Sequence, residues 1–508
     1  MTVARTLAVA LHGVDGTLVE IEADLANGLP AFTIIGLPDT ALGEAKDRVR
    51  SAASNSGCDL PNRKVTVNLS PASLPKHGSG FDLGIAVAAL ATTGAVDTAA
   101  LDGVVHVGEL SLDGRLRPVA GVLPSVLAAR RAGARMVVVP SGNGPEARLV
   151  AGIRVVALGS LREVLIHHGA SLEPVPVEAI PVARPDEVPP AEGDLGDVVG
   201  HPEAIEALQV AAAGGHHLMM LGPPGAGKTL LASRLPGLLP DLEPDAAVEV
   251  ASVRSLAGLA VGSSLVTRPP LESPHHSATM ASLIGGGSGL LRPGAISRAA
   301  HGVLFLDEAP EFSGAVLDAL RQPLETGQIT IHRARSVARF PARFQLVLAA
   351  NPCPCGQAES ADGHCTCTPM ARRRYLGRLS GPLLDRVDLR LTVRRVGVAQ
   401  MTGGGQGSTT TATARARVAR ARSRARERWT DIGTGLNSSV PGSVLRSAPW
   451  RLAPHDRVAL DRALERGALT MRGYDRVLRI AWSIVDLEGA DRPTAEHVGH
   501  ALYLRQGL

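Results

Sequence analysis

The feature that most restricts the fold of this chain is the octapeptide GPPGAGKT at residues 222–229, which satisfies the pattern G-x-x-x-x-G-K-[ST]. The apolar residues 217–221 before it are typical of a buried strand, and LLASRLPGLL after it is typical of a helix. Glycines let the backbone N–H groups of such a loop turn toward phosphates, and the helix N-terminus adds positive partial charge. The sequence therefore predicts an α/β domain that binds ATP. Its expected ATP-binding residues are Gly222, Pro223, Pro224, Gly225, Ala226, Gly227, Lys228 and Thr229.

An apolar segment that ends in two carboxylates follows downstream. Residues 302–306 (GVLFL) predict a buried strand, and Asp307 and Glu308 come directly after it. With the P-loop upstream, we expect Thr229 and Asp307 to hold Mg²⁺ and Lys228 to contact the β- and γ-phosphates. Glu308 is expected to polarise the attacking water as the general base.

A third apolar segment, residues 344–350, predicts another strand, and Asn351 follows its end. In ATPases with this order of motifs, such an amide senses the γ-phosphate and helps to place the water. An asparagine at the end of a strand is otherwise a common turn former. The two motifs upstream favour the sensing role for Asn351.

With 508 residues, the chain is too long for a single hydrophobic core, and we expect two or three domains. Aromatic residues make up only 2% of the chain, so the cores must be built from Ala, Val and Leu. We predict an N-terminal domain, a linker rich in proline and acidic residues, a nucleotide-binding core and a helical C-terminal domain. Their expected bounds are 1–168, 169–193, 194–396 and 403–508, and the last begins with the low-complexity segment 403–413.

The N-terminal domain alternates strand-like and helix-like segments. Residues 64–69 and 136–140 predict strands, and Asp39 is expected to start a helix over ALGEAKDRVRSAA. The most apolar run, residues 83–96, is short and contains Gly, Thr and Ala, so a buried helix is expected there and not a membrane span. No secretory signal is evident at the N-terminus, and we predict a cytoplasmic protein without membrane contact.

Longer stretches of the sequence resemble one family. The strings GPPGAGKT, SPHH, GGGSGLLRPGAISRAAHGVLFLDEAPEF, LRQPLETGQITIHRA, FPARFQLVLAANPCPCG and SGPLLDRVDL are similar to the YifB/ComM family of magnesium-chelatase-like AAA+ ATPases. The resemblance covers essentially the whole chain. It implies a Lon-protease-like (ribosomal S5 domain 2-type) α+β N-terminal domain, an AAA+ P-loop α/β core and a helical C-terminal domain, with ATP and Mg²⁺ as cofactors.

The resemblance also implies roles for two arginines. Arg386, which ends the sequence LDR, matches the arginine finger that reaches the γ-phosphate of a neighbouring subunit. Arg472, which ends LTMR, matches the sensor-2 arginine. A finger that acts between subunits implies a homo-oligomeric ring, which we expect to be a hexamer, with its ATP sites at subunit interfaces.

The N-terminal domain resembles Lon-type peptidases but lacks their catalytic pair. PKHGSGFDLG at residues 75–84 is similar to the loop of their nucleophile, and Asp82 stands where the serine is expected. The segment similar to the one that carries their lysine has GVLPS at residues 121–125 and contains no lysine. A Ser–Lys dyad needs both groups within hydrogen-bond reach, and Ser79 has no recognisable base. We therefore predict a non-catalytic domain and no peptidase activity.

Four of the five cysteines lie close together in the sequence as two C-x-C pairs. They are Cys353, Cys355, Cys365 and Cys367. Four thiolates suit a structural, tetrahedral Zn²⁺ site, although C-x-C is tighter than the usual C-x₂-C and His364 offers a competing ligand. Four reduced cysteines in an ordered loop are the alternative.

Two arginine-rich segments offer contacts for a polyanion. Residues 329–344 predict a β-hairpin, and related AAA+ motors place a hairpin here in the central pore. Residues 415–428 contain seven arginines and predict a helix, on which a basic stripe ends at Arg428. The candidate DNA contacts are Arg333, Arg335, Arg339, Arg417, Arg420 and Arg424. Runs of charge are usually solvated faces, which is the alternative for both segments.

Two classes of function follow from the resemblance. ComM-like proteins imply an ATP-driven motor on single-stranded or branched DNA, a helicase or branch-migration factor of recombination or transformation. The magnesium-chelatase likeness implies an ATP-dependent chaperone or metal-insertion subunit, which would need a separate porphyrin-handling partner. The net charge of +4 permits a polyanionic partner without requiring one, whereas the basic hairpin and helix favour the DNA motor.

Overall fold

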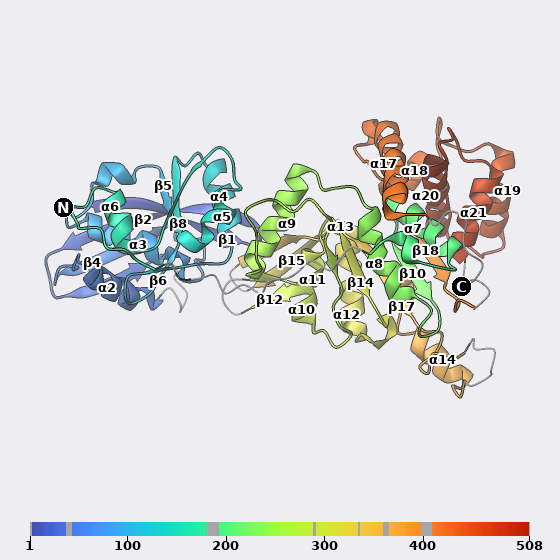
Figure 1. Cartoon of the computed structure of the whole chain (residues 1–508), viewed down its shortest axis with the longest axis horizontal. Coiled ribbons are helices and arrows are strands. Elements are labelled where there is room, and N and C mark those ends of the chain that lie inside the picture. The colour runs from blue at the N-terminus through green and yellow to red at the C-terminus, as the bar shows by residue number, and fades with distance from the viewer. Residues whose placement is uncertain are drawn as a thin grey trace.

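The computed structural model of the chain describes residues 3–36, 43–178, 180, 193–287, 291–333, 336–358, 365–397 and 409–506. The molecule is elongated, and three parts follow one another along its long axis (Figure 1). The N-terminal part lies at one end and the C-terminal helices lie at the other, with the nucleotide-binding part between them. None of the helices in the described ranges is both long and apolar enough to cross a lipid bilayer.

A seven-stranded mixed sheet forms the N-terminal part, in the order β3-β4-β2-β1-β5-β8-β9. β1 and β2 pair antiparallel along their whole length, and alternate residues of β2, such as Val19 and Ile21, are buried. α3 is buried at every position because its side chains are almost all apolar. The elements of this part are β1 (Val3–His12), β2 (Asp15–Ala26), β3 (Ala31–Ile35), α2 (Ala45–Asn55), β4 (Lys64–Ser70), α3 (Asp82–Ala91), β5 (Val104–His106), β6 (Glu109–Leu110), β7 (Leu116–Arg117), α4 (Val122–Arg131), β8 (Met136–Pro140), α5 (Gly144–Ala147), β9 (Arg154–Leu158) and α6 (Leu161–His167).

The strand predictions for this part are confirmed, since residues 64–69 lie in β4 and residues 136–140 form β8. The apolar run at 83–96 is a buried helix as predicted, but the helix, α3, ends at Ala91. Asp39, the predicted helix start, lies outside the described residues.

The nucleotide-binding part contains a five-stranded parallel sheet in the order β11-β14-β17-β10-β18. Residues of β10 alternate between two cores, with Leu218 and Met220 in one and Met219 and Leu221 in the other, so both faces of the sheet are covered. The α/β prediction is thus confirmed. Because β10 lies between two strands from much later in the chain, the loop after β10 opens where α/β sheets bind ligands.

The elements of this part are α7 (Pro202–Gly214), β10 (Leu218–Leu221), α8 (Lys228–Leu238), α9 (Pro244–Ala257), β11 (Leu271–Glu272), α10 (Met280–Ile284), β12 (Gly285–Gly286), β13 (Arg292–Pro293), α11 (Ala295–Arg298), β14 (Val303–Leu306), α12 (Gly314–Ala319), α13 (Arg321–Thr326), β15 (Gln328–Arg333), β16 (Ser336–Pro341), β17 (Gln345–Ala350), α14 (Pro369–Leu376), α15 (Gly381–Leu384) and β18 (Leu389–Thr392).

The C-terminal part is helical, as predicted, and Trp429, Trp450 and Trp482 pack edge to face in its core. Its helices are α17 (Thr411–Arg428), α18 (Gly442–Leu445), α19 (Val458–Glu465), α20 (Met471–Glu488) and α21 (Ala495–Gln506).

The predicted low-complexity segment 403–413 ends inside a regular helix. α17 begins at Thr411, because the side chain of Thr410 accepts a hydrogen bond from the first turn. The hydroxyl of Thr411 also accepts the backbone N–H of Leu195 at 2.7 Å, which ties the start of this helix to the start of the nucleotide-binding part.

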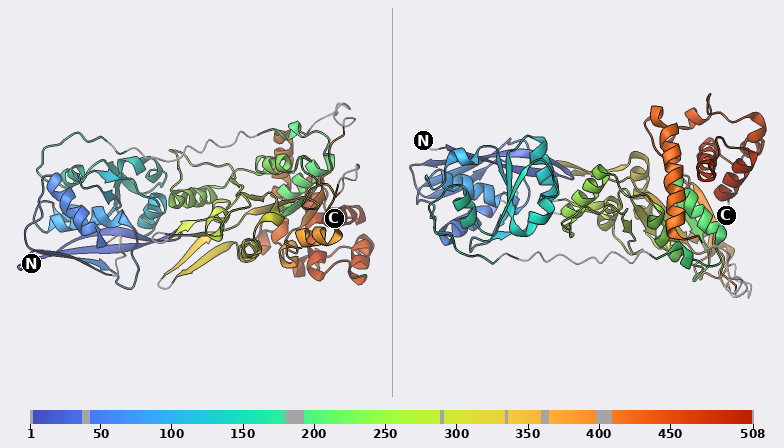
Figure 2. Two further views of the ribbon diagram at one scale, coloured as in Figure 1. Left: turned by 90° about the horizontal axis from the view of Figure 1, so that it is seen from below. Right: turned by 45° about the horizontal axis from the view of Figure 1, so that its top comes forward.

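The predicted hairpin is confirmed as β15–β16, and it projects from the nucleotide-binding part (Figure 2). The turn after β1 contacts this hairpin, since the N–H of Val14 donates to the carbonyl of Arg339 at 3.3 Å. Gly13, with φ 69°, permits the approach, because an added Cβ would stand 2.1 Å from that carbonyl oxygen. A second contact joins α4 to α9, where the N–H of Gly121 donates to the carbonyl of Ser255 at 3.1 Å. The N-terminal part is therefore fixed to the nucleotide-binding part at two places.

Candidate active site

The P-loop connects β10 to α8, and Lys228 is the first residue of that helix. Gly225 and Gly227 have φ angles of 75° and 90°, which glycine adopts without strain. Gly222 lies so close to the backbone of Val393 that an added Cβ would stand 2.1 Å from the carbonyl oxygen of Val393. These glycines let the loop curl around the N-terminus of α8, as a phosphate cradle requires.

The ammonium group of Lys228 lies inside this loop. It donates to the carbonyls of Gly222 at 2.6 Å and Pro223 at 3.0 Å, and to Oδ1 of Asn351 at 3.0 Å. Burial lowers the pKa of Lys228, and two nearby carboxylates oppose that shift. The structure thus brings the predicted phosphate-binding lysine and the predicted sensor asparagine into contact across two parallel strands, β10 and β17.

The two predicted Mg²⁺ ligands also meet. The hydroxyl of Thr229, on α8, donates to Oδ2 of Asp307 at 2.7 Å, just beyond the end of β14. A hydroxyl and a carboxylate are the hard oxygen donors that Mg²⁺ accepts, and Mg²⁺ usually adds phosphate oxygens and waters to them. The residues at this edge of the sheet therefore fit a magnesium–nucleotide complex.

Glu308 lies beside this pair in an uncommon backbone conformation, with φ 49° and ψ 42°. Its carboxylate is turned toward His276, whose Nδ1 lies 3.1 Å from its Oε2. The sequence analysis assigned no role to His276, which it named only within the string SPHH. The signal in the sequence was a histidine shortly after β11. It could be recognised only by knowing that β11 is the neighbour of β14, the strand that precedes Glu308.

His201 is a second neighbour of the site that sequence reasoning missed. It precedes α7, and a Cβ added to Gly227 would stand 3.5 Å from its Nε2, so the ring lies against the P-loop. Burial lowers the pKa of His201, while a backbone hydrogen bond with Ala226 raises it. Burial therefore favours the neutral form of the His201 ring, which lies against the P-loop.

The two arginines carried over from the family do not lie at this P-loop. Arg386 bonds the carbonyl of Pro382 at 2.5 Å and forms an ion pair with the exposed carboxylate of Glu325. Arg472 is exposed at the start of α20. Both arginines and Glu325 line one hollow of about 1110 Å³ between the nucleotide-binding part and the C-terminal helices, and no P-loop residue is among the described residues that line it.

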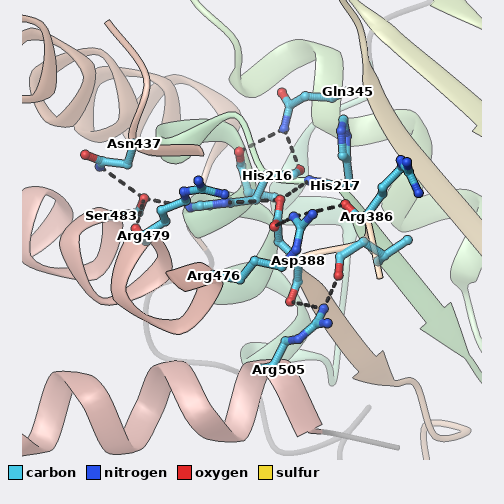
Figure 3. Close-up of polar contacts among 12 residues, drawn as sticks. His216, His217, Gln345, Arg386, Asp388, Asn437, Arg476, Arg479, Ser483 and Arg505 are labelled. Carbon is cyan, nitrogen blue, oxygen red and sulfur yellow. Dashed lines mark hydrogen bonds and ion pairs between the residues drawn. The ribbon is translucent and has the colours of Figure 1, made fainter. Parts of the chain in front are cut away.

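Asp388 fixes the segment that carries Arg386 to the C-terminal helices (Figure 3). This buried carboxylate forms an ion pair with Arg476 of α20 and lies 3.4 Å from Nδ1 of His216. Burial alone would raise the pKa of Asp388, but His216 and the charge of Arg476 outweigh it and hold the pKa below its usual range. Arg505 of α21 donates to the carbonyl of Asp388 at 3.2 Å. The segment that carries Arg386 and the helices α20 and α21 are thus held by one network.

The four clustered cysteines converge, and their sulfur atoms all lie within 4.8 Å of one another. Sγ of Cys353 lies 3.3 Å from that of Cys355 and 3.6 Å from that of Cys365. Zn–S bonds of 2.3 Å place tetrahedral sulfur ligands about 3.8 Å apart, so the set fits Zn²⁺. The loop packs on the P-loop, since a Cβ added to Gly356 would stand 2.4 Å from Pro224. His364, the predicted competing ligand, lies outside the described residues.

The arginines of α17 do not form the uninterrupted basic stripe that the spacing predicts. Arg417 bonds Gln209 and the carbonyl of Leu487, and Arg428 forms an ion pair with buried Asp486. These two arginines take part in packing because α17 contacts both α7 and α20, which the helical spacing alone does not reveal. The predicted contacts Arg420 and Arg424 are exposed.

The hairpin candidates are only partly described. Arg339 is exposed on β16, whereas the side chain of Arg333 and all of Arg335 lie outside the described residues. Phe340, Phe344 and Trp429, the aromatic residues in and beside the two basic segments, are buried and offer no surface for base stacking.

The candidate peptidase residues of the N-terminal part are engaged in other contacts. The hydroxyl of Ser79 bonds the carboxylate of Glu109. Asp82 is buried and paired with Arg48 at 2.7 Å; burial is the main cause that raises the pKa of Asp82 to about 6, and Arg48 opposes it. Lys76 donates to three backbone carbonyls, including those of Gly36 and Leu69 at 2.9 Å. That the part is non-catalytic stays a prediction.

Comparison with known families gives three matches along the chain. The family described as "Subunit ChlI of Mg-chelatase" matches residues 21–143, and "Magnesium chelatase, subunit ChlI" matches residues 194–401. "Magnesium chelatase, subunit ChlI C-terminal" matches residues 408–505.

Similar proteins align over essentially their whole length. An uncharacterised protein of Mycobacterium tuberculosis (strain ATCC 25618 / H37Rv) is 49% identical, with 100% of this chain and 99% of that protein covered. Competence protein ComM of Haemophilus influenzae is 42% identical over 99% of this chain and 98% of its own. Protein YifB of Escherichia coli (strain K12) is 40% identical over 98% of this chain and 96% of its own length. A partial likeness, 28% identity over 37% of this chain, extends to a Lon protease of Brucella suis, of which it covers 24%.

Proposed function

Because the chain belongs to the YifB/ComM family of magnesium-chelatase-like AAA+ ATPases, we propose that it hydrolyses ATP in a homo-oligomeric ring and uses that energy to move on DNA. The observation that carries the proposal is the meeting of Lys228, Asn351, Thr229 and Asp307 at one edge of the parallel sheet. These four side chains come from three separate motifs, and together they supply what ATP hydrolysis needs.

Each side chain has a defined task in this proposal. Lys228 neutralises the β- and γ-phosphates, and Thr229 and Asp307 hold Mg²⁺, which, when bound, draws charge from the phosphate oxygens. Asn351 orients the attacking water, and Glu308 accepts its proton.

The ring is inferred from the position of Arg386. Hydrolysis requires positive charge at the γ-phosphate in the transition state, and an arginine supplies it in many P-loop enzymes. Arg386 lines the hollow beside the C-terminal helices and not the P-loop of its own chain. We therefore assign it to the ATP site of a neighbouring subunit, together with Arg472, and propose a hexameric ring.

The DNA assignment rests on the competence protein ComM among the relatives and on exposed arginines at the hairpin and on α17. A motor has to hold DNA without reading its sequence, which favours phosphate contacts over base contacts. The alternative, an ATP-dependent chaperone or metal-insertion subunit, predicts no such binding.

We predict that the nucleotide-loaded protein binds forked DNA with an affinity that falls steeply with salt, because each phosphate contact adds about 0.9 to the log–log slope. Replacing Arg420 and Arg424 by alanine should lower the slope by up to about 1.8. Fluorescence anisotropy at several salt concentrations measures both effects. The control replaces Arg462 and Arg466, exposed arginines at α19, and removes the same charge elsewhere in the C-terminal part. Absence of binding at low salt would defeat the DNA assignment and favour the chaperone alternative.

We also propose that the four clustered cysteines hold a structural Zn²⁺ that stiffens the loop packed on Pro224. Freshly purified, reduced protein should then contain about one Zn²⁺ per chain by elemental analysis. Replacing Cys353 and Cys365 by serine should remove the metal, because two hydroxyls replace two thiolates. Cys58→Ser is the control, since this cysteine lies in the N-terminal part and should leave the metal content unchanged. Metal-free, fully active wild-type protein would favour four reduced cysteines.

A further inference from the structure

The guanidinium group of Arg386, the proposed arginine finger, is occupied by contacts within its own chain. Nη1 donates to the carbonyl of Pro382 at 2.5 Å, and Nη2 forms an ion pair with Oε1 of Glu325. Nε is buried and has no hydrogen-bond partner within the described ranges. Arginine binds a phosphate best through two parallel N–H groups. Arg386 therefore has to leave Glu325 before both of its terminal nitrogens can contact a γ-phosphate.

The helix α13 fixes the position of Glu325. Glu325 lies in the last turn of α13, and Arg321 lies one turn earlier on the same side of the helix. Nη2 of Arg321 donates to Oγ of Ser380 at 2.9 Å, and Ser380 directly precedes α15, the short helix that leads to Arg386. Two successive turns of α13 are therefore bonded to the segment that carries the finger.

Only the side chain of Arg386 has to move for the finger to leave Glu325. The backbone of Arg386 is held, since its carbonyl accepts Nη1 of Arg476 at 3.2 Å and its N–H donates to the carbonyl of Leu383 at 2.9 Å. The side chain borders the hollow of about 1110 Å³, which leaves room for it to turn. The contacts with Glu325 and Pro382 are thus the main restraint on the finger.

We propose that Glu325 is a positioning residue that holds Arg386 in its own subunit until the γ-phosphate of a neighbouring ATP site draws it away. The inference rests on the ATPase activity and the arginine finger proposed above. The guanidinium N–H groups bind carboxylate and phosphate in the same geometry, so Glu325 and the γ-phosphate compete for Arg386. The side chain of Glu325 is 58% exposed, so water weakens the pair and the phosphate can replace it.

The test is the ATPase activity of mixed rings in which the finger and the P-loop come from different chains. Chains with Arg386→Ala supply intact P-loops, and chains with Lys228→Ala supply intact fingers. Adding Glu325→Ala to the Lys228→Ala chain should raise kcat about two- to fivefold, the factor that an exposed ion pair can hold back, and leave the KM for ATP unchanged. Adding Glu325→Ala to the Arg386→Ala chain should change neither value, because that chain has no finger to hold.

Two further variants in the chain that supplies the finger separate this role from a general change of charge. Glu325→Gln keeps the length of the side chain and one acceptor oxygen but loses the charge, so its kcat should lie between those of the unchanged chain and Glu325→Ala. The control is Glu243→Ala. Glu243 lines the same hollow and pairs with Arg426 at 3.5 Å, so its removal takes away the same charge without touching the finger and should not change kcat.

The outcomes are distinct. An unchanged or lower kcat with Glu325→Ala in the chain that supplies the finger overturns the inference, since Glu325 would then have no effect or would orient Arg386 productively. An equal rise with Glu243→Ala, or with Glu325→Ala in the Arg386→Ala chain, also overturns it. An active wild-type ring without recovery in any mixture would overturn the assignment of Arg386 to a neighbouring site, and the inference with it. If the wild-type protein does not hydrolyse ATP at all, the proposed ATPase function itself fails.

Discussion

Replacing Glu308 by glutamine should lower kcat for ATP hydrolysis by about 10²- to 10⁴-fold and leave ATP binding intact. Glutamine keeps the size of the side chain, but its amide cannot accept the proton of the attacking water. Lys228 and Thr229, the residues proposed to bind the nucleotide, bond Gly222 and Asp307 and should keep these contacts in the variant. Steady-state ATPase rates and equilibrium binding of a fluorescent ATP analogue measure the two effects separately.

Lys228→Ala should impair the binding of ATP, the step before hydrolysis. Loss of a charged hydrogen-bond donor costs about 1.5–3 kcal/mol, so the affinity for ATP should fall about 10- to 150-fold. Lys64→Ala, which removes an exposed lysine of β4, is the matched control. Glu308→Gln protein that hydrolyses ATP at the wild-type rate would show that another group is the base.

Arg386→Ala should bind ATP normally and lose about 10³- to 10⁵-fold in kcat, the contribution of an arginine finger. The reason is its position, since Arg386 lines the hollow beside the C-terminal helices and is paired with Glu325 of its own chain. Arg374→Ala, an exposed arginine of α14, is the control for loss of charge on this side of the molecule.

Mixing Arg386→Ala with Lys228→Ala tests whether the finger acts between subunits. In a mixed ring, a subunit with an intact P-loop can meet a neighbour with an intact Arg386, so part of the activity should return although each variant alone is inactive. Unmixed variants carried through the same exchange give the baseline. Full activity in a dilute wild-type monomer would contradict the proposed interface.

The sequence predicted most of the nucleotide site because its motifs are local. The glycines of the P-loop, Lys228 and Thr229 lie in one continuous stretch of sequence. β14 and β17 are short apolar runs, and the polar residues Asp307 and Asn351 directly follow them. Hydrophobic runs of this kind form parallel strands, and parallel strands end at a common edge, so the residues meet as expected.

What the sequence could not predict depends on long-range packing. His276 meets Glu308 only because β11 is the neighbour of β14, and nothing in the spacing of these residues fixes that order. Arg417 and Arg428 looked like parts of a free basic face, but the positions of α7 and α20 decide which arginines of α17 are exposed. Helical periodicity predicts on which face of the helix a side chain lies, but not which other helix packs against that face.

The contact between the turn at Gly13 and the backbone of Arg339 links the N-terminal domain to the hairpin. If the hairpin moves in the proposed ATP-driven cycle, the N-terminal domain has to move with it, because the two are bonded. A molecule that binds the N-terminal domain would then resist the movement of the hairpin. An exchange of N-terminal domains between relatives would preserve that linkage only if the residue at position 13 has no side chain.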